Sequence, residues 1–135
     1  MAFGVATKLT NKGVAIFADR VRTTPGTYTT SPKFIAIGTG ATGAARTAAV
    51  ADTALTTEVE TRASGTESTV TTTVTGDTYQ SQGTVSITGT RAVDESGLFD
   101  ASTSGNMFTS ATLNVINLLS GDSLQLTWKA QITTS

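Results

Sequence analysis

The clearest pattern in the chain is a strict alternation of apolar and polar residues near its C-terminus. Apolar side chains occupy every second position from Leu124 to Ile132, and polar side chains fill the positions between them. Since successive side chains of a β-strand point to opposite faces, the pattern predicts a strand with one buried face and one wet or interface-facing face. Leu124, Leu126 and Trp128 are therefore expected core residues.

Shorter segments of the same kind precede this strand. The main β region is expected to span about residues 68–133, with Val85 and Ile87 in alternation and glycine–aspartate turn pairs at 76–77 and 121–122. Strands at about ten-residue spacing with turns between them are typical of an antiparallel β-sandwich. We expect a mainly β fold, jelly-roll-like, in a single domain over residues 1–135.

One segment has helical rather than strand periodicity. Residues 10–22 are expected to form an N-terminal α-helix that Thr10 caps. Apolar residues recur at positions i, i+3, i+4 and i+7, a spacing that forms a single stripe on a helix. The stripe is expected to face the core, with Phe17 as its main anchor, and consists of Val14, Phe17, Ala18 and Val21.

The middle of the chain gives weaker signals. Residues 33–38 predict a short strand, and the Gly/Ala/Thr-rich segment 39–51 predicts a loop. Two interpretations remain open for residues 52–62. Leu55 and Val59 stand four apart, as in a helical turn, whereas the alternation in the same segment suits a strand equally.

The composition of the chain mainly excludes classes of function. The chain has 30 threonines, which favour extended backbone, and only 14% of its residues are charged. It has no cysteine and no histidine, so thiolate chemistry and the commonest general base and metal ligand are missing. We expect no enzyme activity, no cofactor and no metal. The weak charge, net −1, offers no electrostatic footprint for nucleic acid.

No membrane or secretory signal is expected either. The apolar runs are short and broken by Thr, Ser or Gly, far from the roughly 20 residues that a membrane helix needs. Charge is distributed unevenly, because residues 1–62 carry seven basic and four acidic side chains, whereas residues 63–135 carry two and six. Opposite charges on the two halves could steer docking onto a partner or a neighbouring copy.

A glycine motif follows the predicted strand at 33–38. Residues 38–43 spell G-T-G-A-T-G, and Glu58 lies 20 residues after Gly38, which is the spacing of a dinucleotide-binding fingerprint. The downstream segments alternate, whereas the buried strands of a parallel nucleotide-binding sheet are continuous apolar runs. We therefore expect a tightly turned loop and no nucleotide site.

Acidic residues are the remaining candidates for chemistry. The candidate carboxylates for glycosidase chemistry are Glu58 with Glu60, and Asp94 and Glu95 with Asp100, but aromatic residues to line a sugar cleft are few. A second acidic group could hold Ca²⁺ through oxygen ligands. We expect it to form a solvated turn instead, with Gly97 turning the chain above buried Leu98 and Phe99; this group consists of Asp94, Glu95 and Asp100.

Two stretches of the chain resemble virion proteins of tailed bacteriophages. The first is T-N-K-G-V-A-I-F-A at 10–18, leading into F-I-A-I-G-T-G at 34–40. It is similar to the opening of tail-collar-type fibre proteins, in which a T-N-x-G helix precedes an F-x-x-I-A-L-G-x-G strand. The resemblance covers the predicted helix and the first predicted strand.

The second stretch comprises D-E-S-G-L-F-D-A at 94–101, G-N-M-F-T-S-A-T at 105–112 and L-L-S-G-D-S-L-Q-L-T-W-K at 118–129. It is similar to a G-L-F-D-A…G-G-x-M…G-D-x-L-x-x-T-W pattern of phage structural proteins. The resemblance implies a non-enzymatic virion component that assembles in the host cytoplasm as a homo-oligomer. Because the chain stops after its last predicted strand, it resembles capsid cement or decoration proteins, often trimers, more than fibres.

The resemblance also implies partners. These are further copies of the chain and other virion proteins such as the major capsid protein, whose acidic surface would meet Lys8, Lys12, Arg20, Arg22 and Lys33. A tail, baseplate or fibre-anchoring subunit is the alternative hypothesis. A third is a carbohydrate-binding module on the particle surface, for which Tyr28 and Tyr79 are the candidate aromatic platform.

Overall fold

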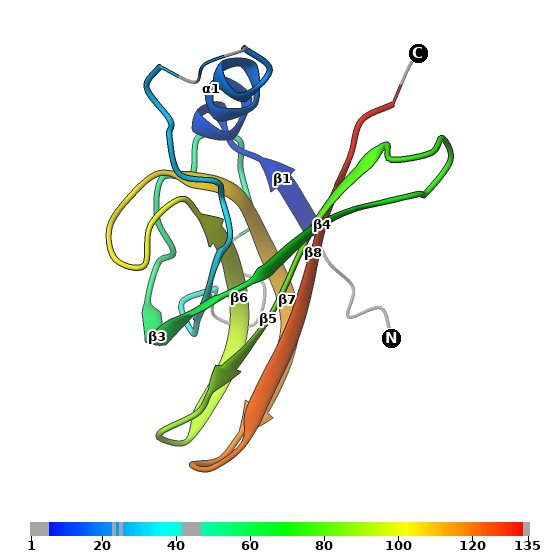
Figure 1. Cartoon of the computed structure of the whole chain (residues 1–135). Helices are drawn as coiled ribbons and strands as arrows, with labels where there is room; N and C mark the ends of the chain where they lie inside the picture. Colours follow the sequence, from blue (N-terminus) through cyan, green and yellow to red (C-terminus); the bar gives the residue numbers. More distant parts are fainter. Residues whose placement is uncertain (1–5, 23, 25, 42–46, 134–135) are drawn as a thin grey trace.

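About half of the described residues fold into extended strands, which the abundance of threonine favours. The computed structural model describes residues 6–22, 24, 26–41 and 47–133. Within these residues a five-stranded sheet has the order β1-β7-β6-β2-β3 and a three-stranded sheet has the order β4-β5-β8 (Figure 1). The strands are β1 (Ala6–Leu9), β2 (Phe34–Gly38), β3 (Glu58–Ser64), β4 (Thr66–Val70), β5 (Thr78–Ser86), β6 (Arg91–Phe99), β7 (Met107–Leu118) and β8 (Ser123–Gln131).

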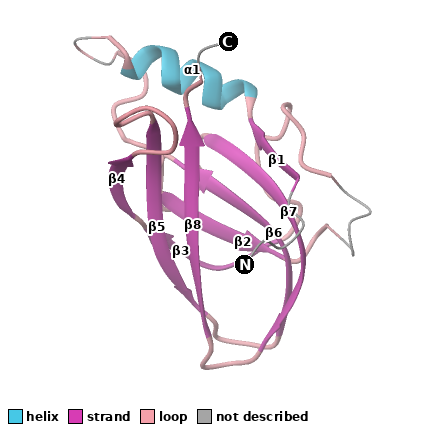
Figure 2. Cartoon of the chain, turned by 90° about the vertical axis from the view of Figure 1, so that its right-hand side faces the viewer, coloured by secondary structure: helices cyan, strands magenta, loops and turns pink. Residues whose placement is uncertain are grey.

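Every neighbouring pair of strands is antiparallel, and the helix α1 (Asn11–Arg20) lies across one end of the two sheets (Figure 2). The connections β5–β6 and β7–β8 cross between the sheets at the other end (Figure 1). There Ile87 and the turn at 119–122 exchange backbone hydrogen bonds, from Ile87 N to Asp122 O and from Gly121 N to Ile87 O, each 2.9 Å long. The mainly β, two-sheet fold with one N-terminal helix is thus confirmed.

The main core lies between the sheets. It contains Ile35 and Ile37 from β2, Val85 from β5 and Trp128 from β8, and all four are buried. The alternation near the C-terminus has the predicted outcome up to Ala130, because Leu124 and Leu126 pack partly buried against this core while the residues between them are exposed. Ile132, the last apolar residue of the pattern, is instead 57% exposed. Leu98 is also buried in this cluster.

A second, smaller core covers the opposite face of the five-stranded sheet. Phe99 is buried there among Ala36, Leu55 and Met107. Leu55 belongs to the segment 47–57, which lies over this face; Ala48 N donates to Thr112 Oγ1 at 2.8 Å within the same cover. Strand β6 is therefore covered on both sides, and its residues from Val93 to Phe99 are all buried.

This double cover corrects the expected turn at 94–101. Asp94 and Glu95 are not solvated but lie inside β6 with 3% and 0% of their surface exposed, and Gly97 is in the strand rather than in a turn. A Cβ at Gly97 would stand 2.9 Å from the Phe99 ring, so the glycine allows close packing. Because β6 is covered on both faces and buries acidic residues, its sequence lacks the alternation of apolar and polar residues that identifies a half-buried strand.

The expected orientation of the helix is also wrong. Val14, Phe17 and Val21 are 56%, 40% and 71% exposed, so Phe17 is not a core anchor. The helix buries Gly13, Ile16 and Asp19 instead. The physical reason is the contact at its N-terminus, where a Cβ on Gly13 would lie only 2.1 Å from the Phe108 carbonyl oxygen. The glycine lets the helix backbone touch β7, and that contact fixes the rotation of the helix.

Capping at the same place behaves as expected. The Thr10 side chain accepts a hydrogen bond from Gly13 N at 2.9 Å, and its hydroxyl donates to the Met107 carbonyl. Thr10 N also donates to Phe108 O at 3.0 Å. The helix start is thus attached to β7 through both its backbone and its cap.

Strand β1 and the segment from residue 39 to residue 62 differ in part from the structure predicted for them. For residues 52–62 the strand interpretation is right from Glu58 onward, where β3 begins. Strand β1 was not predicted, and the last part of the 39–51 loop packs over the sheet through buried Ala48. Part of that loop lies outside the described residues.

We predict that Gly13→Ala destabilises the protein by about 1–3 kcal/mol, although alanine is the better helix former, because the new methyl group collides with the Phe108 carbonyl. Thermal or urea unfolding measures the effect. Gly89→Ala is the matched control, since a Cβ there meets nothing closer than 3.5 Å. Equal stability of the two variants would contradict the contact between helix and strand.

Candidate functional site

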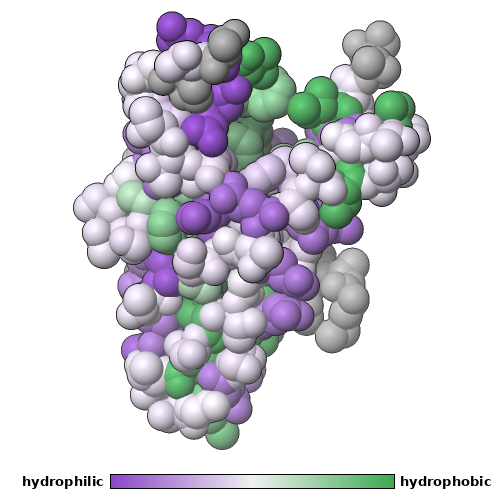
Figure 3. Space-filling view, in the orientation of Figure 1, coloured by the Kyte–Doolittle hydropathy of each residue, from purple (hydrophilic) through white to green (hydrophobic). Residues whose placement is uncertain are grey.

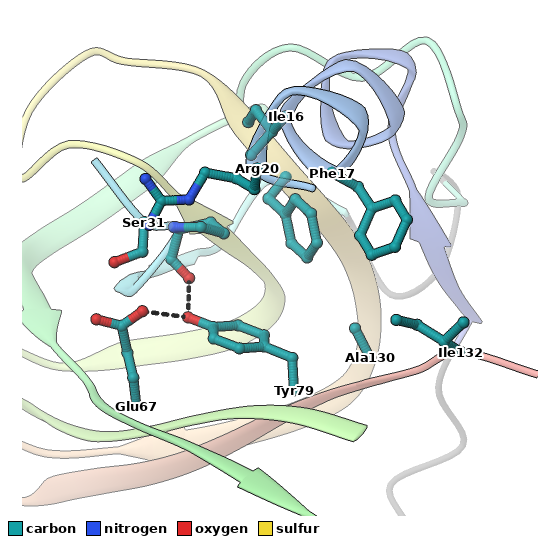
Figure 4. Close-up of a pocket in the computed structure, with 10 residues that line it drawn as sticks. Ile16, Phe17, Arg20, Ser31, Glu67, Tyr79, Ala130 and Ile132 are labelled. Carbon is teal, nitrogen blue, oxygen red and sulfur yellow. Dashed lines mark hydrogen bonds between the residues drawn. The ribbon is translucent and has the colours of Figure 1, made fainter. Parts of the chain in front are cut away.

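A concave feature lies beside α1. A pocket of about 250 Å³ separates the helix from the end of β8, and its walls are Phe17 on one side and Ile132 on the other (Figure 4). Tyr79 and Phe108 contribute their rings to its lining. We call this pocket the α1 groove.

Tyr79 connects the groove to the sheet behind it. Its ring meets the Phe108 ring edge-on, with the centroids 6.4 Å apart. Its hydroxyl oxygen lies 2.8 Å from Pro32 O and 3.0 Å from Glu67 Oε1, so its one proton can be donated to either acceptor (Figure 4). Burial of the ring, together with the charge of Glu67, raises the pKa of Tyr79 above its usual range. The hydroxyl therefore stays a neutral donor at ordinary pH.

Exposed apolar side chains continue from the groove over the helix. We call Leu9, Val14, Phe17 and Val21 the apolar ridge; all are at least 40% exposed. Across the groove stands Ile132, which is 57% exposed. Val74, which is 64% exposed, lines a neighbouring hollow together with Ile132. Figure 3 shows apolar surface on the helix flank and on the side of the β4–β5 hairpin. The periodicity of the sequence identified the helix stripe but assigned it to the core.

The loop after the helix is held by one carboxylate. Asp19 accepts backbone hydrogen bonds from Gly26, Thr27 and Tyr28 and an ion pair from Arg22 at 3.0 Å. The Tyr28 N–H and these other donors lower the pKa of Asp19 to about 2. The hydrogen bonds from this loop thus compensate the burial of the Asp19 charge, and the same bonds hold the loop in place.

Aspartate has the same role at the β4–β5 hairpin. Asp77 accepts backbone hydrogen bonds from Thr72, Thr73 and Val74 and one from the Gln131 side chain. The Val74 and Thr72 N–H groups lower the pKa of Asp77. Val74, in the hairpin that Asp77 holds, lines a second hollow of about 240 Å³ together with Ile132.

The basic residues proposed as partner contacts have different surroundings. Lys8 on β1 and Lys12 and Arg20 on α1 are exposed, and Arg22 directly follows the helix. Arg20 donates to the carbonyl oxygens of Tyr28 and Thr29 at 3.3 and 2.9 Å. The structure therefore places four of the five basic residues on β1, on α1 or directly after the helix.

Lys33 lies apart from that group. It is half-buried just before β2, with Nζ 3.9 Å from Glu67 Oε2 and 5.9 Å from the centre of the Phe34 ring. Its charge is therefore engaged at the Glu67 side of the α1 groove.

The candidate carboxylate pairs are engaged in internal contacts. Glu58 makes a two-pronged ion pair with Arg62, at 2.7 and 2.9 Å, and Glu60 pairs with Arg91 at 2.8 Å. A hydrogen bond from Thr88 and the Arg91 contact lower the pKa of Glu60. Each glutamate thus has its own arginine, which differs from the facing pair that glycosidase chemistry uses.

The glycine motif also contacts an acidic residue, to which it donates a backbone hydrogen bond. Glu95 accepts hydrogen bonds from the N–H groups of Gly40, Thr56 and Thr57 at 3.2, 3.1 and 2.9 Å. A Cβ at Gly38 would lie 2.5 Å from Glu95 Oε1, so the glycines permit this approach. Backbone donors of the kind that hold a phosphate in nucleotide-binding loops here hold the protein's own carboxylate.

The neighbouring acidic residues are engaged in the same way. Asp94 accepts from Ala41 N at 3.0 Å, and Asp100 accepts from Asn106 N and Nδ2 at 2.7 and 2.8 Å. Among the described residues there is no group of three or more acidic side chains placed to hold a metal ion. Gly43, the last residue of the motif, lies outside the described residues.

The two tyrosines of the carbohydrate hypothesis have different surroundings. Tyr79 lies in the α1 groove against Phe108, whereas Tyr28 lies under Lys12, whose Nζ is 6.0 Å from the ring centre. Both rings are partly buried against the core.

We predict that Asp19 stabilises the protein above about pH 4 and loses this effect toward pH 2. Because its pKa is lower in the folded chain than the ordinary 3.8, the stabilisation is present above 3.8 and disappears as pH falls through 2. Melting temperatures of the native chain and of Asp19→Asn should therefore differ at pH 6 and converge near pH 2. A difference that is constant from pH 6 to pH 2 would contradict this role.

No helix in the described ranges is long and apolar enough to span a membrane. Comparison of the chain with protein-family models, with curated protein sequences and with solved structures found no match.

Proposed function

We propose that this protein is a structural component of a virus particle, a capsid cement or decoration protein of a phage head, that attaches to the shell through the apolar ridge. The observation that carries the binding role is the outward orientation of the helix stripe. The assignment to a virion comes from the sequence resemblance at 10–18, 34–40 and 94–129. The two together favour a protein that works through its surface.

The chemistry of the surface supports a protein partner. Exposed apolar side chains are ordinary one by one, but a contiguous set with a groove is typical of interaction sites. Four basic residues lie on β1, on α1 or just after the helix, so a fitting partner carries carboxylates as well as apolar side chains. These basic residues are Lys8, Lys12, Arg20 and Arg22.

A tail, baseplate or fibre-anchoring subunit is the second candidate. The collar-like stretches at 10–18 and 34–40 favour it, and they correspond to α1 with its Thr10 cap and to β2 with its continuing loop. The same ridge would then contact a tail protein. The two candidates differ in the location of the partner and agree on the contact surface.

Cryo-electron microscopy of particles assembled without this protein separates the candidates. The cement proposal predicts an intact tail, missing density on the outer shell and a shell that opens at lower temperature. An unchanged shell with missing tail density would contradict it and select the tail candidate. Unchanged particles would overturn both.

We predict that Val14→Asp weakens attachment of the purified protein to particles that lack it by at least about tenfold, because a charge would have to be buried in an apolar contact. Co-sedimentation measures binding. Since Val14 is 56% exposed, the melting temperature should change little. Val115→Asp on β7 is the control, with a valine that is 46% exposed and not part of the ridge. Equal binding of both variants would exclude the ridge as the contact.

A further inference from the structure

The edges of the two sheets differ in how they are protected. Free sheet edges invite pairing with another chain, and proteins block them with short strands, charges, prolines or bulges. Strand β1 has four residues and β4 has five. Strand β3 carries Glu58, Glu60 and Arg62, its register with β2 shifts, and Glu60 has a left-handed φ of 64°. Three of the four edges are thus short, charged or irregular.

Strand β8 has little of this protection. It is nine residues long, and it pairs with β5 from Ser123 to Gln131 without any shift in register. It contains no proline and one charged residue, Lys129. Within the described ranges no strand pairs with its other side. A long, regular edge of this kind is a template for another strand.

The side chains of β8 are complementary to a second copy of the same strand. An antiparallel pair centred on Thr127 places Lys129 opposite Gln125 of the other copy, so no like charges meet. On the core-facing side the same register places Leu126 opposite Trp128 and Leu124 opposite Ala130. Polar residues thus meet polar residues and apolar residues meet apolar ones along the whole strand.

We propose that two copies of this protein pair through their β8 strands around a two-fold axis at Thr127, joining the three-stranded sheets into one six-stranded sheet. A two-fold contact of this kind is self-complementary and closed, so it ends at the dimer. It replaces the three-fold arrangement that the phage resemblance implies. The contact does not depend on the virion assignment, since it follows from the strand edge alone.

The mass of the full chain in solution is the first test. Light scattering after size exclusion should give twice 13.8 kDa. A monomer at high micromolar concentration would overturn the proposal. A trimer would also overturn it, because head-to-tail pairing of β8 with another edge has no two-fold axis.

A cysteine at the axis tests the register. The chain has no cysteine, so Thr127→Cys introduces a single thiol. Facing residues of an antiparallel pair have Cα atoms about 4.5–5.5 Å apart, within the range of a disulfide. Mild oxidation should convert this variant to a covalent dimer at least tenfold faster than Thr84→Cys, which lies exposed on neighbouring β5. Equal rates would overturn the register.

A charge at the axis tests the contact without a covalent bond. Thr127 is exposed, so Thr127→Lys should fold normally but place two ammonium groups opposite each other. The dimer dissociation constant should rise at least tenfold, whereas Thr84→Lys should leave it unchanged. An unaltered dimer of Thr127→Lys would exclude the β8 contact, whatever the result of the particle experiments.

Discussion

The contact between Gly13 and the Phe108 carbonyl determines how the apolar ridge is arranged. A missing side chain lets α1 touch β7, and the Thr10 cap attaches the same point through its hydroxyl. With this rotation fixed, Ile16 points inward and Phe17 lies on the wall of the α1 groove. The exposed stripe on the helix is thus a consequence of packing at the helix start.

Buried or half-buried carboxylates hold several loops and turns of this protein in place. Asp19, Asp77 and Glu95 each accept several backbone N–H groups, and each thereby fixes a segment without regular structure. Backbone donors at such places need a partner, and an ionised carboxylate is a strong acceptor. Glu95, which resembled part of a candidate site in the sequence, therefore has structural contacts.

The predictable and unpredictable parts of the fold have different physical origins. Strand β8 and the mainly β class follow from alternation, because a half-buried strand shows its two faces in its sequence. Strand β6 shows no such signal, since it is covered on both sides and carries buried Asp94 and Glu95. Periodicity predicts the position of the helix but not which face packs against the sheet, because it identifies an apolar stripe without specifying what covers that stripe. A glycine at the third helical position was the one available hint of a close contact.

The apolar stripe of α1 faces outward. Because the chain has no cysteine, single-thiol variants can measure this directly through their rate of reaction with a small alkylating reagent in the native protein. The structure predicts that Val14→Cys reacts almost as fast as the unfolded chain, whereas Ile16→Cys, at a position 1% exposed, is protected at least a hundredfold. Protection of Val14→Cys with rapid reaction of Ile16→Cys would contradict this orientation of the helix.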